Sequence, residues 1–234
     1  MKRILFFIFV LVGSLLADEV YATFDVMALK SANLAFSTTG EVNKVLVDVG
    51  SRVKEGEVLA SLKNDDLKAL LDMAKSGFEF AKKEYDRQLK VKKLIDKSRL
   101  DKYKFNLDSA KAKYLYQKAL YEKSLLKAPF DGIITAKLIE SGDVVSGAMI
   151  RTALKIQNYD KQKLVLSYDQ KYISKVKVGD IFRYKIDGQN SFKEAKITKI
   201  YPTVDPKSRM AKAEVIVKDE ITGLFGDGVI KCTK

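Results

Sequence analysis

The side chains that carry most enzyme chemistry are nearly absent from this chain. Its 234 residues include no His and a single Cys, Cys232. This composition excludes a Ser–His–Asp triad, a Cys–His pair and a zinc site of the usual His and Cys type. A single Cys also excludes an intrachain disulfide. The sequence therefore predicts a protein that is not an enzyme, with no catalytic residues, no metal site and no bound cofactor.

The net charge of +13 is spread along the chain. Residues 65–127 carry a net charge of +7 and residues 158–234 carry +6, and acidic residues are interleaved with the basic ones in both segments. Nucleic-acid-binding proteins show clustered Lys and Arg within recognisable motifs, and this sequence has none. The pattern argues against nucleic acid as a partner and favours an acidic protein or an anionic lipid surface.

The first 17 residues have the composition of an export signal. Lys2 and Arg3 precede an apolar run over residues 4–16. This arrangement matches a secretory signal peptide at residues 1–17, with cleavage after Ala17 or as late as Ala22. The run is shorter than the ~20 residues that span a bilayer, so an uncleaved anchor is the lesser alternative. We expect an exported protein that is soluble or bound peripherally to a membrane.

Two segments bounded by glycines repeat at a fixed offset. Gly40–Gly56 alternates apolar and polar residues as half-buried strands do, and the pattern returns at Gly132–Gly147. The equivalent glycines lie 92 positions apart, with a one-residue deletion before the last pair: Gly40 and Gly132, Gly50 and Gly142, Gly56 and Gly147. The repeat predicts two halves of one pseudo-symmetric β-sandwich, with tight turns at these glycines. Two unrelated hairpins are the alternative.

Between the two halves the apolar period changes from two residues to about 3.5. The period is carried in one arm by Leu67, Leu71, Ala74, Phe78, Ala81 and Tyr85, and in the other by Leu100, Tyr103, Leu107, Ala110, Tyr114, Gln117 and Tyr121. These narrow seams predict two helices that pack against each other, with Lys-rich solvated outer faces. Asn64 or Asp65 is expected to cap the first helix and Ser98 the second, which Pro129 would close.

The repeat and the residues that follow the second helix resemble one protein family. The half-motif G-x-V-x-x-V-x-V-x-x-G-x-x-V-K-x-G of Gly40–Gly56 and the step Ala128-Pro129-Phe130-Asp131-Gly132 resemble periplasmic adaptor proteins. These are the membrane fusion proteins of the haemolysin-secretion-D type that serve tripartite efflux pumps. The resemblance covers residues 24–230. It implies a mixed β fold, elongated and modular: a lipoyl-like β-sandwich, an α-helical coiled-coil hairpin inserted between its halves, and a β-barrel.

Placed on this chain, the resemblance implies domain limits. The β-barrel is expected at residues 23–36 plus 158–234, the lipoyl-like domain at 37–63 plus 128–157 and the hairpin at 64–127. Alternation predicts barrel strands at Lys163–Tyr168, Lys193–Ile200 and Ala211–Lys218, with turn signals that include Gly226–Gly228. Most relatives carry a further membrane-proximal domain, for which the stretches at both ends are missing here, so a compact adaptor is expected.

The resemblance also implies a docking site at the hairpin tip. Many such adaptors carry there an Arg, a Leu four residues later and a Ser seven residues beyond, which dock on the outer-membrane channel. This chain has Arg87, Val91 and Ser98 at that spacing. Arg87 would offer its five-donor fork, Val91 an apolar contact and Ser98 a short donor and acceptor. The alternatives are a local ion pair of Arg87, seam packing of Val91 and a helix cap at Ser98.

The function implied by the resemblance is that of a non-catalytic periplasmic adaptor, peripherally associated with the inner membrane. It would join an inner-membrane transporter to a TolC-like outer-membrane channel for export of small molecules or drugs, and would self-associate into a ring. A resistance-nodulation-division (RND) transporter is the first choice, and an ABC export or type I secretion system is the second. Five scattered Met and no His argue against a relay of soft metals.

A biotinyl or lipoyl carrier domain is the distant alternative, because it uses the same β-halves. A carrier presents one modifiable Lys on a tight turn between its halves. Here residues 64–127 replace that turn, and the export signal would send the protein away from the enzymes concerned.

Overall fold

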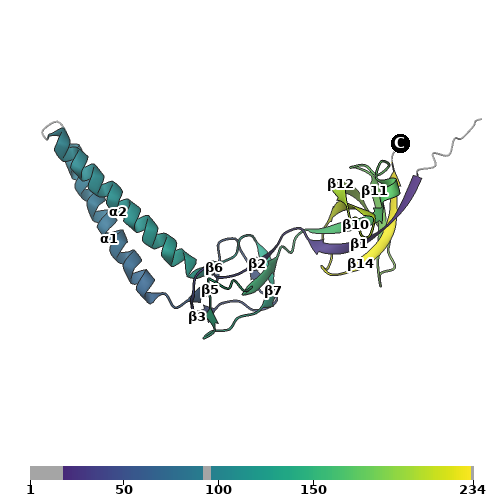
Figure 1. The fold of residues 1–234 in the computed structure, drawn as a ribbon, viewed down its shortest axis with the longest axis horizontal. Coiled ribbons are helices and arrows are strands. Elements are labelled where there is room, and N and C mark those ends of the chain that lie inside the picture. The colour runs from purple at the N-terminus through teal and green to yellow at the C-terminus, as the bar shows by residue number, and fades with distance from the viewer. Residues whose placement is uncertain (1–17, 92–95, 233–234) are drawn as a thin grey trace, which may run out of the picture. The chain divides into compact units, whose positions relative to one another are not determined.

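The structure is a computed structural model that describes residues 18–91 and 96–232. The expected signal peptide, residues 1–17, lies outside the described residues. The chain divides into two compact units, one from residues 1–29 and 160–234 and the other from residues 30–159. Figure 1 labels both helices and many of the strands of the two units.

The first unit is a closed barrel of six antiparallel strands. Their order around the barrel is β1 (Asp18–Ala28), β10 (Gln162–Asp169), β13 (Met210–Val217), β12 (Lys193–Val204), β11 (Ile181–Ile186) and β14 (Phe225–Cys232), and β14 pairs back with β1. A 3₁₀ turn, Gln170–Tyr172, follows β10. Strand β1 alternates buried and exposed side chains, as expected where one face lines a core and the other meets water.

Aromatic side chains fill the middle of the barrel. The Phe24 ring meets those of Phe182 and Tyr184 edge to face, at 5.7 and 5.4 Å between centroids. Burial raises the pKa of Tyr184 to about 12, and the charge of Glu220 adds to this shift. Gly226 and Gly228 lie inside β14, opposite these rings, rather than in the turn that the sequence predicts. A Cβ at either position would collide with a carbonyl of β11 and with an aromatic ring. Glycine is therefore needed here for the close approach of strand and ring, and not for a turn.

The second unit contains a β-sandwich of two four-stranded sheets. One sheet has the order β2 (Ser31–Leu34), β9 (Leu154–Gln157), β7 (Gly132–Lys137) and β4 (Arg52–Val53), and the other β6 (Leu125–Lys127), β5 (Val58–Leu62), β3 (Gly40–Val45) and β8 (Val144–Val145). Each sheet takes strands from both predicted halves. The sandwich core includes Val42 and Ile134, at equivalent positions of the repeat, and both are 1% exposed.

The Ala-Pro-Phe-Asp-Gly step ties the two halves together. The amide of Ala128 donates to the carbonyl of Glu57 at 2.9 Å, and the carbonyl of Ala128 accepts from the amide of Gly56 at 2.8 Å. The carboxylate of Asp131 accepts from the amide of Glu55 at 2.7 Å. The step therefore pairs with the last turn of the first half, which explains why these five residues mark the start of the second half.

The predicted glycine turns divide into two kinds. Gly50, Gly56 and Gly142 have φ of 89°, 80° and 95°, a backbone region that strongly favours glycine. The other three, Gly40, Gly132 and Gly147, are placed where a Cβ would crowd a neighbour. Gly40 and Gly132 are the first residues of β3 and β7 rather than turn residues.

Some domain limits differ from those predicted. Strand β2 pairs with β9 of the sandwich, so residues 30–36 do not belong to the barrel, and β1 begins at Asp18 rather than at Thr23. The sequence does not mark this boundary between the two units, because Leu29 and Lys30, which lie between β1 and β2, include no Gly or Pro. Strand β6 belongs to the sandwich rather than to the hairpin. The second helix ends at Lys123, before Pro129.

Candidate partner-docking site

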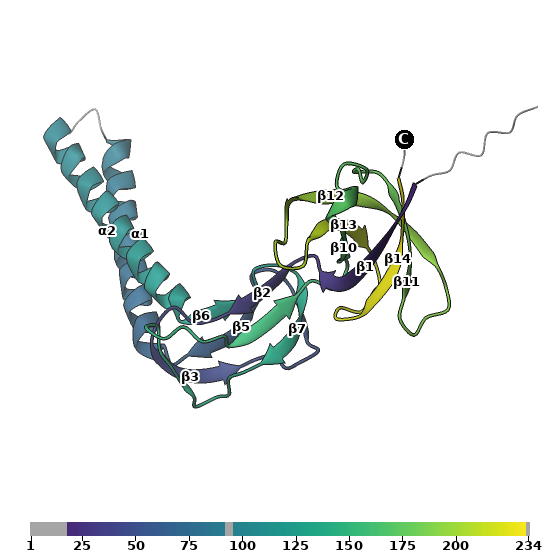
Figure 2. The same ribbon diagram turned by 45° about the vertical axis from the view of Figure 1, so that its right-hand side comes forward.

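Two long antiparallel helices connect the halves of the sandwich. They are α1 (Asp65–Lys90) and α2 (Lys97–Lys123), and they lie side by side in Figures 1 and 2. Every residue of the two predicted seams is buried or half-buried, which confirms the 3.5-residue period. Midway along the pair the rings of Phe78 and Tyr114 stack with centroids 5.7 Å apart and planes 5° from parallel. The seams thus hold the far end of the hairpin in a defined place.

One polar atom in the seam is unsatisfied. The side-chain oxygen Oε1 of Gln117 is buried and accepts no hydrogen bond from the residues that the structure describes. A buried acceptor without a donor destabilises the folded state by about 1–3 kcal/mol. A polar residue in such a seam restricts the register in which two helices pair.

The base of the hairpin is closed by a polar contact. Asn64, which precedes α1, donates from Nδ2 to the hydroxyl of Ser124, which follows α2, at 2.8 Å. The Ser124 hydroxyl donates in turn to the carbonyl of Tyr121 at 2.6 Å. Asn64 occupies the N-cap position but makes no side-chain bond to its own helix. Its side chain joins the two arms instead of capping one of them.

The predicted docking residues lie at the end of the hairpin remote from the sandwich. Arg87 is in the last turn of α1, is 66% exposed and forms an ion pair with Glu84 of the same helix. Val91 follows the last residue of α1 and is 41% exposed, so it does not pack in the seam. Ser98 is exposed in the first turn of α2. Residues 92–95, which join the helices, lie outside the described residues.

The cap of α2 is Asp96 and not Ser98. The Asp96 carboxylate accepts from the amide of Ser98 at 2.6 Å, and the carbonyl of Asp96 accepts from the amides of Arg99 and Leu100. Asp and Ser are equally good caps, so their order in the sequence does not decide between them. Within residues 18–91 and 96–232, the Ser98 hydroxyl has no hydrogen-bond partner.

The hairpin surface also carries apolar side chains that the sequence reading missed. On α1, Leu70, Met73 and Phe80 are 41%, 59% and 64% exposed. They lie at helical spacing one position before the seam residues, with Gly77 between Met73 and Phe80. On α2, Phe105 and Tyr116 are exposed as well. The outer surface is thus not uniformly charged, and a count at steps of three and four from Leu70 would have found the stripe on α1.

The described residues offer neither a cluster of metal ligands nor a helix that could cross a membrane. No group of three or more His, Cys, Asp or Glu side chains in this part of the chain is arranged to hold a metal ion. Among the same residues, no helix is both long and apolar enough to cross a membrane.

Three solved structures share this fold. A MacA–MexA chimeric protein containing the Pseudomonas aeruginosa MexA α-hairpin domain has a TM-score of 0.78 at 19% identity, over 93% of this chain and 80% of the chimera. The membrane fusion protein Spr0693 from Streptococcus pneumoniae has a TM-score of 0.70 at 14% identity, over 92% of this chain and 100% of its own. MacA from Actinobacillus actinomycetemcomitans has a TM-score of 0.62 at 20% identity, over 92% of this chain and 78% of its own.

A sequence relative is an uncharacterised protein of Haemophilus influenzae. It is 25% identical over 206 residues, which cover 84% of this chain and 53% of the Haemophilus protein. The chain therefore spans about half the length of the curated relative that it matches.

The family model of the CzcB-like barrel-sandwich hybrid domain matches residues 30–151. This range runs from the start of the second unit, through the hairpin, to the residues before β9. The match and the shared folds confirm the mixed β architecture with an inserted hairpin, and with it the resemblance to membrane fusion proteins. Because more than half of the chain is matched, the protein belongs to the CzcB-like barrel-sandwich hybrid family.

Proposed function

We propose that this protein is a non-catalytic periplasmic adaptor that links an inner-membrane efflux transporter of the RND type to a TolC-like outer-membrane channel. It is exported by the signal peptide at residues 1–17 and assembles around the transporter as a ring. Small molecules or drugs pass through the conduit so formed, driven by the transporter. The work of the adaptor is assembly, sealing and transmission of conformational change.

The observation that carries the proposal is the hairpin inserted between the two halves of the sandwich. A carrier domain needs one Lys on a tight turn at that place, whereas this chain has two helices of 26 and 27 residues. At a rise of 1.5 Å per residue each arm reaches about 40 Å. Such a pair serves to reach a distant partner. The name of the Streptococcus pneumoniae structure, a membrane fusion protein, supports this reading.

The tip of the hairpin provides groups for an end-to-end contact with the channel. The Arg87 guanidinium pairs with Glu84 but is exposed enough to donate its remaining N–H groups outward. Val91 offers an exposed apolar side chain, and the Ser98 hydroxyl is without a partner in the described chain. We assign these three residues to the channel contact.

The apolar stripe of α1 supports self-association. Leu70, Met73 and Phe80 lie in line along one side of the hairpin and expose their side chains to water. Gathered apolar side chains of this kind mark protein contacts. In the proposed ring, this side of each hairpin faces a neighbouring copy.

Co-purification from intact cells tests the proposal. The full chain, with an affinity tag at its C-terminus, is crosslinked reversibly in cells, purified from membranes and analysed by mass spectrometry for its partners. A matched variant replaces residues 65–123 by a short Gly–Ser turn, which the contact of Asn64 with Ser124 allows without moving the sandwich. The full chain should capture an RND transporter and an outer-membrane channel, and the variant should lose the channel but keep the transporter.

Other outcomes distinguish the alternatives. Recovery of an ABC transporter in place of the RND type supports an adaptor of an ABC export or type I secretion system. Recovery of a cytoplasmic enzyme complex, or of a lysine carrying biotin or lipoate, overturns the adaptor role.

A further inference from the structure

A groove of about 770 Å³ opens on the sandwich beside β7 and β8. It is lined by Phe36, Leu138, Ile139, Asp143, Val144, Val145, Ser146, Met149, Arg151 and Thr152. All come from one compact unit, from β8 itself and from the residues that follow β2, β7 and β8. The volume lies within the range of small-molecule sites, about 300–1,000 Å³.

The groove has an apolar floor and apolar rims. Phe36 and Ile139 are 4% and 8% exposed and belong to the core below. By contrast Leu138, Val144 and Met149 expose 57%, 77% and 63% of their surface at the edges. Single exposed apolar side chains are ordinary, but several gathered around one concavity mark a surface that is covered in use.

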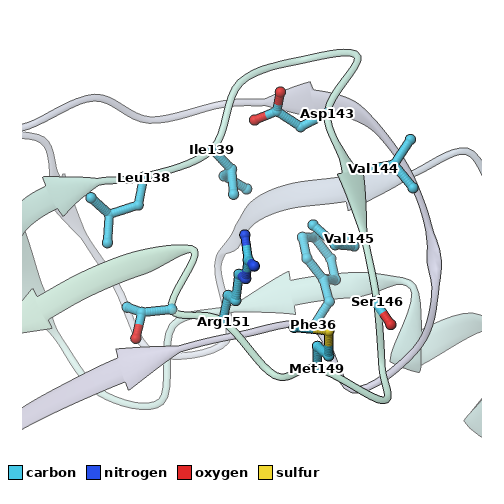
Figure 3. A pocket seen from close by; sticks show the side chains of 10 residues that line it. Phe36, Leu138, Ile139, Asp143, Val144, Val145, Ser146, Met149 and Arg151 are labelled. Carbon is cyan, nitrogen blue, oxygen red and sulfur yellow. The ribbon is translucent and has the colours of Figure 1, made fainter.

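Arg151 is the cation of this groove. Figure 3 shows its side chain rising between Leu138 and Ile139 on one side and Phe36 and Val145 on the other. Over residues 18–91 and 96–232 no carboxylate pairs with its guanidinium and no acceptor bonds to it. Asp143, the acid of the lining, instead accepts from the amide of Glu140 at 2.8 Å. An unpaired guanidinium beside apolar walls is suited to an anionic head group, which would form charge-assisted hydrogen bonds with it.

We propose that this groove binds one molecule of an anionic amphiphile, such as a medium-chain carboxylate. The acid group lies on the Arg151 guanidinium, and the chain covers Phe36 between Leu138 and Met149. Arg151 selects for negative charge and the walls select for an apolar body. This site is separate from the hairpin tip, and the inference does not depend on the role proposed for the protein.

A series of probes with one chain and three head groups tests the site. Decanoate, decyltrimethylammonium and decyl maltoside are titrated into the full-length mature protein below their micelle-forming concentrations, and the methyl signal of Met149 is followed by NMR. Decanoate should bind saturably and at least tenfold more tightly than the other two, since a hydrogen bond to a charged group is worth about that factor.

Two matched variants remove one Arg each. Arg151→Gln keeps much of the side-chain length but loses the charge, and should weaken decanoate binding about tenfold while leaving decyl maltoside unchanged. Arg99→Gln, at an exposed position on α2, should leave the binding of both decanoate and decyl maltoside unchanged. Val144→Ser should weaken all three probes together, because it removes apolar surface.

The proposal is overturned if the three head groups bind equally, or if Arg151→Gln has no effect on decanoate. It is also overturned if only vesicles of anionic phospholipid, and not free decanoate, shift the Met149 signal. Sedimentation that shows a dimer whose formation buries Met149 and blocks decanoate would assign the groove to a second copy instead.

Discussion

Val42 and Ile134, 92 positions apart in the chain, make the same pair of backbone hydrogen bonds to opposite halves of the sandwich. The amide of Val42 donates to Asp143 at 2.8 Å and its carbonyl accepts from Gly142 at 2.8 Å. The amide of Ile134 donates to Ser51 at 3.0 Å and its carbonyl accepts from Gly50 at 2.8 Å. Each half thus closes on the turn of the other, so neither half can complete its hydrogen bonding alone.

The two halves should respond differently to a methyl group at equivalent glycines. In Gly132→Ala the new Cβ would lie 2.6 Å from the Gln157 carbonyl oxygen and 2.7 Å from a side-chain carbon of Ile156. In Gly40→Ala it would meet only the Leu62 side chain, whose terminal Cδ1 lies at 3.0 Å and whose Cβ lies at an ordinary contact distance of 3.4 Å. We expect a loss of about 1–3 kcal/mol of unfolding free energy for Gly132→Ala and less than about 1 kcal/mol for Gly40→Ala. Urea denaturation of both variants measures this, and equal losses would contradict it.

Replacing the buried amide of the hairpin seam should stabilise the hairpin. Gln117→Leu removes the unsatisfied Oε1 and adds apolar contact, with an expected gain of about 1 kcal/mol. Lys113→Leu, at an exposed position nearby, should change the stability by no more than about 0.5 kcal/mol and serves as the control. Thermal unfolding followed by helical circular dichroism provides the comparison. A lower melting temperature for Gln117→Leu would show that the amide has a partner in solution.

Reversal of the tip charge should affect assembly far more than folding. Arg87→Glu loses the pair with Glu84 and repels it, which costs about 0.5 kcal/mol on an exposed helix. If Arg87 meets a group of the channel, the same change costs about 2–5 kcal/mol of binding, or at least tenfold in affinity. Efflux and crosslinking to the channel are measured beside Lys83→Glu, an exposed control on α1.

Ser98→Ala tests the channel contact without removing a helix cap, because Asp96 caps α2 and the Ser98 hydroxyl does not. Its melting temperature should stay unchanged while crosslinking to the channel falls. Wild-type efflux and crosslinking in both variants, with normal export, would show that the channel is bound by other residues.

The barrel should lose stability at high pH through Tyr184. Burial raises the pKa of its hydroxyl to about 12 in the folded state, whereas an unfolded Tyr has a pKa of about 10. The unfolded state therefore releases this proton first, and the stability present below pH 10 falls by up to about 2–3 kcal/mol as the pH rises to about 12. Tyr184→Phe should show a shallower fall over this range than the wild type. Tyr21→Phe, an exposed control, should follow the wild type.

The start of β1 predicts the site of signal cleavage. Val20 and Ala22 are 0% exposed in the barrel core, and Ala22 pairs with both Tyr168 and Gly228. Cleavage after Ala22 would remove these residues and leave β10 and β14 without part of their partner. We therefore expect cleavage after Ala17. The intact mass of the protein from a periplasmic fraction should correspond to a chain that begins at Asp18, and a chain beginning at Thr23 would contradict this.

Periodic features could be predicted from the sequence because each period corresponds to one local geometry. The 3.5-residue seam identified the half-buried residues of both helices, and the offset of 92 identified the paired halves of the sandwich. The glycines were ambiguous, since the same residue type supports a positive φ at Gly50 and a close approach at Gly228. Only the neighbours in space distinguish these two uses.

Features that depend on distant neighbours could not be predicted. The groove beside Arg151 is formed by β8 and by residues that follow β2, β7 and β8, and its rim residues are ordinary apolar residues in the sequence. The chain passes from one unit to the other at Leu29 and Lys30, between β1 and β2, where no Gly or Pro marks a boundary. The cap of α2 could have been either Asp96 or Ser98, because both side chains suit that position.

The way in which the hairpin joins the sandwich has an evolutionary consequence. Both arms leave the sandwich from the adjacent strands β5 and β6, where Ser61 pairs with Leu125, and Asn64 joins Ser124 just beyond. Whole heptads can therefore be inserted into or deleted from the arms without altering the strand pairing of the sandwich. The length of the hairpin can thus vary under selection independently of the sandwich from which it projects.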